Sequence, residues 1–132
     1  MPHYVISPVA QRDIQAILAW THKHFGVNGR LRYAAILVRA IDDVVENPQR
    51  AGSQARPEIA TAARTYHLRH SRDRVEPAGD RVYRPRHFLL YRIGKDGQVE
   101  IGRVLHDRMD LARHLPDEYR PPIPGEQATE SP

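Results

Sequence analysis

A helical pattern that begins at Ser7 and ends at Gly26 sets the first constraint on how this chain folds. A serine side chain caps free backbone N–H groups, and Pro8 suits the first helical position. Gly26 is a typical helix end. Between them apolar side chains recur at helical spacing and predict one buried face, formed by Ala10, Ile14, Ile17, Leu18, Thr21 and Phe25.

A second helical pattern follows after only a short break. Asn28 is a candidate cap for its start, and Asn47-Pro48 is a typical stop. Its apolar stripe consists of Tyr33, Leu37, Ile41 and Val44. Two helices joined by so short a connection form an αα-hairpin. We expect both stripes to lie in the core, because an isolated helix is marginal without packing along its apolar side.

The remaining pattern is that of short strands. Alternating or apolar runs predict them, and Asp96-Gly97 predicts a hairpin turn between the last two. The predicted strands are His3–Ser7, Arg64–His70, Arg86–Ile93 and one that begins at Val99 and ends in the sequence RVLH.

The segments between these strands predict less regular structure. Residues Gln49–Ala63 read as a loop. The charged segment Ser71–Pro85 reads as a long hairpin loop, with Arg81–Tyr83 as a candidate strand extension. Residues Asp110–Leu115 can form one or two helical turns. Beyond Pro116 the proline-rich composition predicts a disordered tail.

These elements predict an α+β fold in the order β-α-α-β-β-β. We expect an antiparallel sheet with the two-helix hairpin packed on one face and a short C-terminal helix. The predicted domain covers residues 1–115, and residues 116–132 form the tail. The sequence has no repeats and no sign of a second domain.

Composition narrows the chemistry. The chain has no cysteine, which rules out disulfides and thiolate catalysis, and no window approaches the length of a membrane span. We therefore expect a cytoplasmic protein. No metal-ligand set, phosphate-binding glycine loop or serine-nucleophile motif is present, so no metal or cofactor is predicted. His67 and His70, three residues apart on one strand, would point to opposite faces.

Positive charge is concentrated in the second half of the domain. Residues 64–108 contain eleven Lys or Arg and six Asp or Glu, whereas the rest of the chain contains nine and ten. Most of the cations are arginine, which suits bidentate pairing with carboxylate or phosphate. The predicted binding surface on three adjacent strands consists of Arg69, Arg86, Arg92, Arg103, His106 and Arg108. The alternative interpretation is a solvated face with ion pairs to Glu100, Asp107 and Asp110.

Several stretches in order resemble the ParE branch of the RelE/ParE superfamily of bacterial type II toxin–antitoxin (plasmid stabilisation) systems. They are YVISPVAQRDIQAILAWTHKHFG, IDDVVENP, HFLLYRI and VEIGRVLHDRMDLARHL, and together they cover about residues 4–115. The resemblance implies a small toxin with a cognate antitoxin, assembled as a hetero-oligomer. It also implies one of two targets, because ParE-type relatives act on DNA gyrase and RelE-type relatives cleave mRNA on the ribosome.

The nuclease relatives pair basic residues with a Tyr or His-Tyr near the C-terminus. Here His106 is followed by an extra segment, and Tyr119 lies in the proline-rich region. We therefore favour a toxin that inhibits gyrase by direct binding, with no catalytic residues assigned. The alternative is a ribosome-dependent endoribonuclease that uses Arg69, Arg86, Arg103 and His106. A third interpretation is a degenerate toxin that acts only as a co-repressor with its antitoxin.

Overall fold

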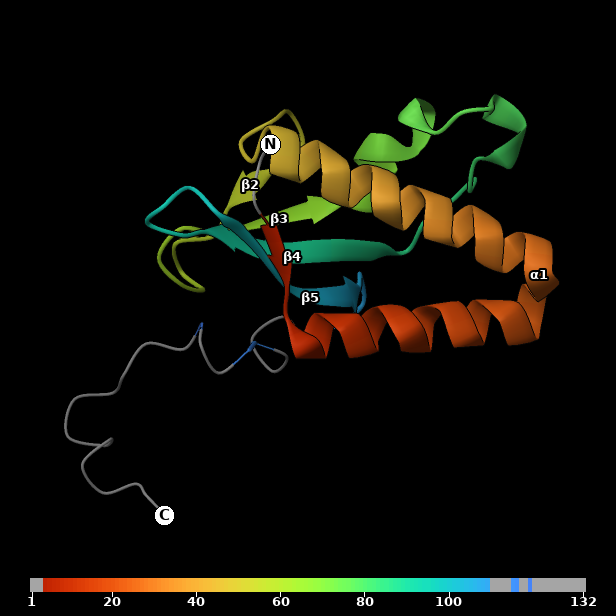
Figure 1. Ribbon diagram of the computed structural model, residues 1–132, viewed down its shortest axis with the longest axis horizontal. Helices are drawn as coiled ribbons and strands as arrows, with labels where there is room; N and C mark the ends of the chain where they lie inside the picture. The colour runs from red at the N-terminus through yellow and green to blue at the C-terminus, as the bar shows by residue number, and fades with distance from the viewer. Residues whose placement is uncertain (1–3, 110–114, 117–118, 120–132) are drawn as a thin grey trace, which may run out of the picture.

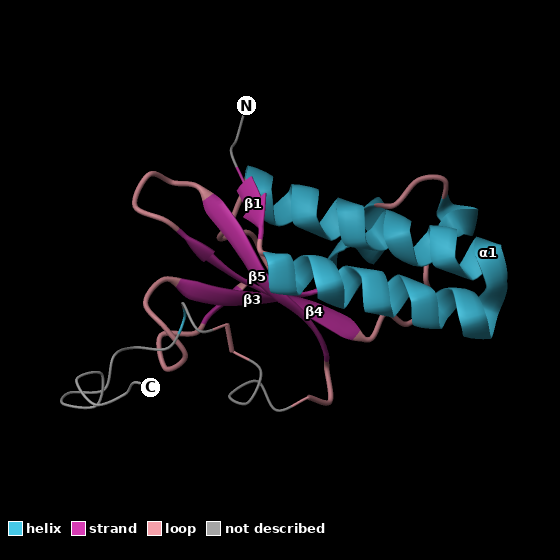
Figure 2. Ribbon diagram, turned by 60° about the horizontal axis from the view of Figure 1, so that its bottom comes forward, coloured by secondary structure: helices cyan, strands magenta, loops and turns pink. Residues whose placement is uncertain are grey.

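The helical segment α1 (Pro8–Glu46) covers one face of a five-stranded sheet in the computed structural model (Figures 1 and 2). The structure describes residues 4–109, 115–116 and 119. The strands are β1 (Tyr4–Ile6), β2 (Gln54–Ala55), β3 (Ala63–His67), β4 (His87–Ile93) and β5 (Val99–His106). Two short 3₁₀ helices, η1 (Leu68–Arg74) and η2 (Ala78–Asp80), lie between β3 and β4.

The start, break and stop of α1 confirm the predicted helical pair. The Ser7 hydroxyl accepts a hydrogen bond from the backbone N–H of Ala10 at 3.0 Å. Gly26 has φ 77° and ψ −171°, a conformation that glycine adopts without steric cost, and it divides α1 into two arms. Asn47 caps the C-terminal end. The two arms run alongside each other and meet at a bend that projects past the strands (Figures 1 and 2).

The sheet is mixed, so the prediction of an antiparallel sheet was wrong in two respects. Its strand order is β1-β5-β4-β3-β2, and the last three long strands form the expected antiparallel meander. However, β1 pairs with β5 in parallel, with Tyr4 opposite Val99. The predicted loop Gln49–Ala63 also contains β2, whose two residues pair with β3.

The predicted strand Arg64–His70 stops at His67 because a buried carboxylate draws the following chain toward α1. Asp43 is 1% exposed and accepts hydrogen bonds from the Ser71 hydroxyl at 2.6 Å and from Arg74 at 3.0 Å. These bonds hold η1 against the second arm of α1. The candidate strand extension Arg81–Tyr83 was also wrong, because Arg81 donates to the backbone carbonyls of Asp73 and Val75 instead.

The main core lies between α1 and the sheet. Most of its helical side chains come from the second arm, including Ile36 and Val44, and they pack with Leu89, Tyr91 and Ile101 of the sheet. Phe25 was expected in this core and is instead 66% exposed, because it lies at the bend beyond the strands. A smaller cluster of Ala63, Leu90 and Tyr119 packs with Ile59, Ala60 and Leu115.

The predicted short helix Asp110–Leu115 and the predicted disordered tail over residues 116–132 lie largely outside the described residues. The domain boundary at residue 115 therefore stays a prediction.

Candidate functional site

Strand direction brings charged side chains together at one end of the sheet. β3 and β5 both run antiparallel to β4, so both end where β4 begins. Cross-strand pairs at this end are His67 with Phe88 and His87 with His106. We call the group here the strand-end cluster, and it consists of His67, Arg69, Arg86, His87, His106, Asp107 and Arg108.

Asp107 is the centre of the strand-end cluster. One carboxylate oxygen accepts from the Nη2 and Nε atoms of Arg86 at 3.1 and 3.3 Å, and the other accepts from Nε2 of His67 at 3.1 Å. Partial burial alone would raise the pKa of Asp107. The hydrogen bonds from His67 and Arg86 outweigh this effect and hold that pKa below its usual value. Asp107 is therefore a structural anion that joins β3, β4 and the turn after β5.

Both ring nitrogens of His67 are occupied. The backbone N–H of Arg69 donates to Nδ1 at 3.1 Å, so the ring proton lies on Nε2 and is donated to Asp107. Burial, opposed by Asp107 and reinforced by the charge of Arg69, lowers the pKa of His67. A neutral imidazole with both nitrogens engaged has no free position for proton transfer to a substrate.

His87 is held neutral by Tyr33 of α1. The Tyr33 hydroxyl accepts from the backbone N–H of Arg86 at 3.0 Å, which leaves its own proton to donate to Nδ1 of His87 at 2.6 Å. Burial and the neighbouring His106 lower the pKa of His87 to about 4. Burial also raises the pKa of Tyr33 to about 12. This contact fastens the second arm of α1 to the end of the sheet.

The turn after β5 repeats the arrangement that follows β3. Nδ1 of His106 accepts from the backbone N–H of Arg108 at 3.1 Å, as Nδ1 of His67 does from Arg69. Both strands therefore end in a His-x-Arg sequence whose histidine caps the turn and whose arginine is exposed. The His106 ring lies edge-on to His87, with 5.2 Å between ring centroids.

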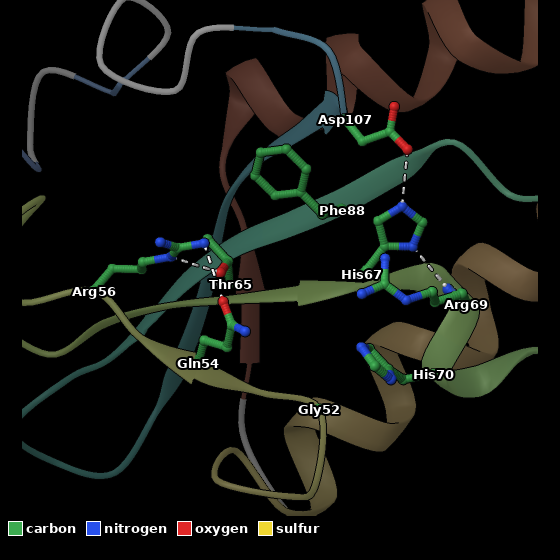
Figure 3. Close-up of a pocket in the computed structure, with 9 residues that line it drawn as sticks. All are labelled: Gly52, Gln54, Arg56, Thr65, His67, Arg69, His70, Phe88 and Asp107. Atoms are coloured by element: carbon green, nitrogen blue, oxygen red, sulfur yellow. Dashed lines mark hydrogen bonds and ion pairs between the residues drawn. The ribbon is translucent and has the colours of Figure 1, made fainter.

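An open pocket of about 210 Å³ lies beside the strand-end cluster (Figure 3). The side chains of His67, Arg69 and Asp107 form one side, and Phe88 and Thr65 line it from the sheet. The opposite side includes Arg56, which Thr65, Gln54 and Glu58 engage, and Gly52. The pocket is therefore polar around a small apolar area.

The structure brings four of the six predicted binding residues to this end of the molecule: Arg69, Arg86, His106 and Arg108. The side chains of Arg69 and Arg108 make no hydrogen bond or ion pair within the part of the chain that the structure describes. They are the cations of the cluster that remain available to a partner.

The structure places Arg103 and Arg92 elsewhere. Arg103 donates to both carboxylate oxygens of Asp13 on α1, at 2.8 and 2.9 Å, and Asp13 also accepts from the backbone N–H of Val104. Arg103 therefore ties β5 to the helical layer. Arg92 lies six residues from Arg86, about 20 Å along β4, and its Nε donates to Glu100 at 2.9 Å.

Tyr119 is fixed rather than loose, which corrects the expectation drawn from its proline-rich surroundings. It is 2% exposed and lies against Gly102, where an added Cβ would come within 2.7 Å of the tyrosine oxygen. Its hydroxyl donates to the carbonyl of Glu100 at 3.3 Å, and the Arg92 guanidinium lies 4.7 Å from its ring centroid. Tyr119 is thus near the Arg92 end of β4, away from His106.

The sequence analysis did not assign a role to His87, Tyr33 or the carboxylate partners Asp13 and Asp43. A local signal existed only for the repeated His-x-Arg at two strand ends. The other contacts join residues far apart in the chain. No group of three potential metal ligands occurs among the described residues. None of the helices in the described part is long and apolar enough to cross a membrane.

The low pKa of His87 predicts acid sensitivity. The unfolded chain takes up a proton near pH 6.5 and the folded chain only near pH 4, so stability is full above pH 6.5 and falls as the pH drops toward 4. We expect a loss on the order of 2 kcal/mol over this range. Urea unfolding at several pH values measures it.

The control for this prediction is a matched pair of variants. His87→Gln, which keeps an acceptor for Tyr33, should flatten the pH dependence, whereas His22→Gln on the exposed face of α1 should not. An unchanged slope in His87→Gln would contradict the assignment.

The comparisons with known proteins agree with this fold. Residues 4–111 match the family model described as "ParE toxin of type II toxin-antitoxin system, parDE". Curated relatives named Toxin ParE1, from two strains of Mycobacterium tuberculosis, are 30% identical over 112 residues, which is 85% of this chain and 96% of theirs. The chain belongs to the ParE toxin family of type II toxin–antitoxin systems.

Proposed function

We propose that this toxin inhibits DNA gyrase by direct protein binding and that a cognate antitoxin neutralises it in a hetero-oligomeric complex. The proposal places the chain in the cytoplasm, where its target acts. Membership of the family supports the toxin role and implies an antitoxin partner. The choice of target rests on the chemistry of the basic residues.

The pairing of Arg103 with Asp13 is the observation that carries this choice. A ribonuclease of the alternative kind needs several cations around one phosphate and a group with a free position for proton transfer. Arg103 is held by Asp13, about 10 Å along β5 from His106. Arg86 is held by Asp107. A phosphate would have to displace both carboxylates before these arginines could bind it.

The cations that remain available suit a protein partner. Arg69 and Arg108 are exposed at the sheet end, on a backbone fixed by the two histidine caps. Fixed guanidinium groups at a surface steer and orient an acidic partner. The strand-end cluster is therefore our proposed contact with the target.

A supercoiling assay with purified gyrase tests the proposal. We expect micromolar folded toxin to block supercoiling of relaxed plasmid, and pre-incubation with antitoxin to restore it. A matched sample of toxin that has been unfolded by heat serves as the control. Full supercoiling in the presence of folded toxin would refute gyrase as the target.

The pocket keeps the ribonuclease as a second candidate. Phe88 can stack against a base, and Arg69 can reach a phosphate at the pocket edge. In that case primer extension on translating mRNA would show toxin-dependent cuts in the ribosomal A site, and His67→Ala would remove them. Growth arrest without such cuts rules this candidate out. Absence of any growth arrest on expression would favour the degenerate toxin.

A further inference from the structure

The bend between the arms of α1 exposes four large apolar side chains. Trp20, Phe25, Val27 and Leu31 are 57%, 66%, 52% and 54% exposed, and all lie within residues 20–31. We call them the hairpin tip. The bend projects past the strands in both views (Figures 1 and 2). Gathered apolar side chains at a projecting surface are typical of an interaction site, whereas single exposed ones need no explanation.

The aromatic part of the hairpin tip is held in place before any partner arrives. The Trp20 ring stacks on His24, with 4.1 Å between centroids and 22° between planes, and Phe25 packs beside Trp20 at 5.9 Å. Arg30 of the second arm donates to His22 of the first at 3.2 Å and joins the arms. Rigid aromatic side chains lose little entropy on binding, which is why they dominate protein interfaces.

The charge around the hairpin tip has one sign. No Asp or Glu occurs between Asp13 and Asp42, whereas the same stretch contains four cations, Lys23, Arg30, Arg32 and Arg39. Lys23 and Arg30 lie within the tip itself. The surface is therefore apolar with a basic rim, and it complements a segment that is apolar with an acidic rim.

We propose that the hairpin tip binds an amphipathic helical segment of a partner protein, with acidic residues beside its apolar stripe. A second copy of this chain fits poorly, because two basic rims would repel. The flat stacking of Trp20 on His24 offers a surface for another helix rather than a wedge for a lipid bilayer. The aliphatic side chains Val27 and Leu31 give nucleic-acid bases no ring to stack on. The proposal holds whichever target the toxin acts on.

Selection of random peptides on the full-length chain tests this. Enriched peptides are synthesised and their affinity is measured by fluorescence anisotropy. We expect peptides with Leu, Ile or Phe at i, i+3 or i+4 and Asp or Glu between them. Trp20→Ala combined with Leu31→Ala should weaken their binding by about tenfold or more. Lys23→Glu should also weaken it.

The matched control is Val38→Ala, which shortens an apolar side chain of α1 that is equally exposed but lies outside the tip. It should leave the affinity unchanged, and circular dichroism should show native helix in every variant. The proposal is overturned if no peptide is enriched, if enriched peptides lack acidic residues or helical spacing, or if the tip variant binds them as well as the native chain. It is also overturned if phosphatidylglycerol vesicles or a short single-stranded oligonucleotide bind through Trp20 and Leu31 instead.

Discussion

Replacing Asp43 with alanine is expected to lower the free energy of unfolding by about 3–5 kcal/mol, because it leaves buried partners without their anion. Asp43 is 1% exposed and lies within 3.0 to 3.7 Å of nitrogen atoms of Arg39, Arg50 and Arg74. The Ser71 hydroxyl would also lose its acceptor. Urea denaturation of the two proteins side by side measures the loss.

The neighbouring residue provides the control. Asp42 is exposed and has no contact within the described chain, so Asp42→Ala removes the same charge at almost no cost. Because Asp43 also holds η1, we expect Asp43→Ala to open the segment 68–85 to limited proteolysis. Equal stability of the two variants would show that the three arginines do not depend on this carboxylate.

Reversing the charge of Arg69 and Arg108 together is expected to raise the toxin concentration needed to inhibit gyrase by about tenfold to a hundredfold at low salt. The difference should shrink at high salt, where surface charges are screened. Both side chains are exposed at the sheet end, so the fold should remain intact. Supercoiling inhibition, titrated at two ionic strengths, measures the effect.

A variant with the same change in net charge separates location from charge. Arg12→Glu with Lys95→Glu alters two exposed cations, one on α1 and one in the turn between β4 and β5. We expect it to inhibit nearly as well as the native toxin. Equal weakening of both double variants would contradict a specific role for the strand-end cluster. Arg103→Glu is unsuitable here, because breaking its pair with Asp13 would disturb the fold.

Local sequence patterns were sufficient for the helices and the meander. Ser7, Gly26 and Asn47 act through residues within four positions, and the structure confirms each of them. β1 contains three residues, and nothing in so short a segment specifies whether it pairs in parallel or with which strand. Phe25 continued the apolar spacing of its helix, yet the pattern contained no information about where the sheet stops.

The candidate site was only partly predictable for the same reason. Arg69, Arg86, His106 and Arg108 follow or precede strands at one sheet end, which a correct strand order predicts. The partner of Arg103 is 90 residues earlier in the chain, and that of Arg74 is 31 residues earlier. Sequence spacing does not reveal such pairs, so it could not distinguish an available arginine from one already held by a carboxylate.

The parallel pairing of β1 with β5 has a consequence for synthesis of this toxin. Val5 lies opposite Glu100, and the Ser7 hydroxyl that caps α1 donates to the carbonyl of Gly102 at 2.9 Å. A growing polypeptide cannot complete its first strand until its last one has left the ribosome, since contacts of such long sequence separation form late. The toxin is therefore harmless for most of its translation, which gives antitoxin already in the cell time to meet it as it emerges.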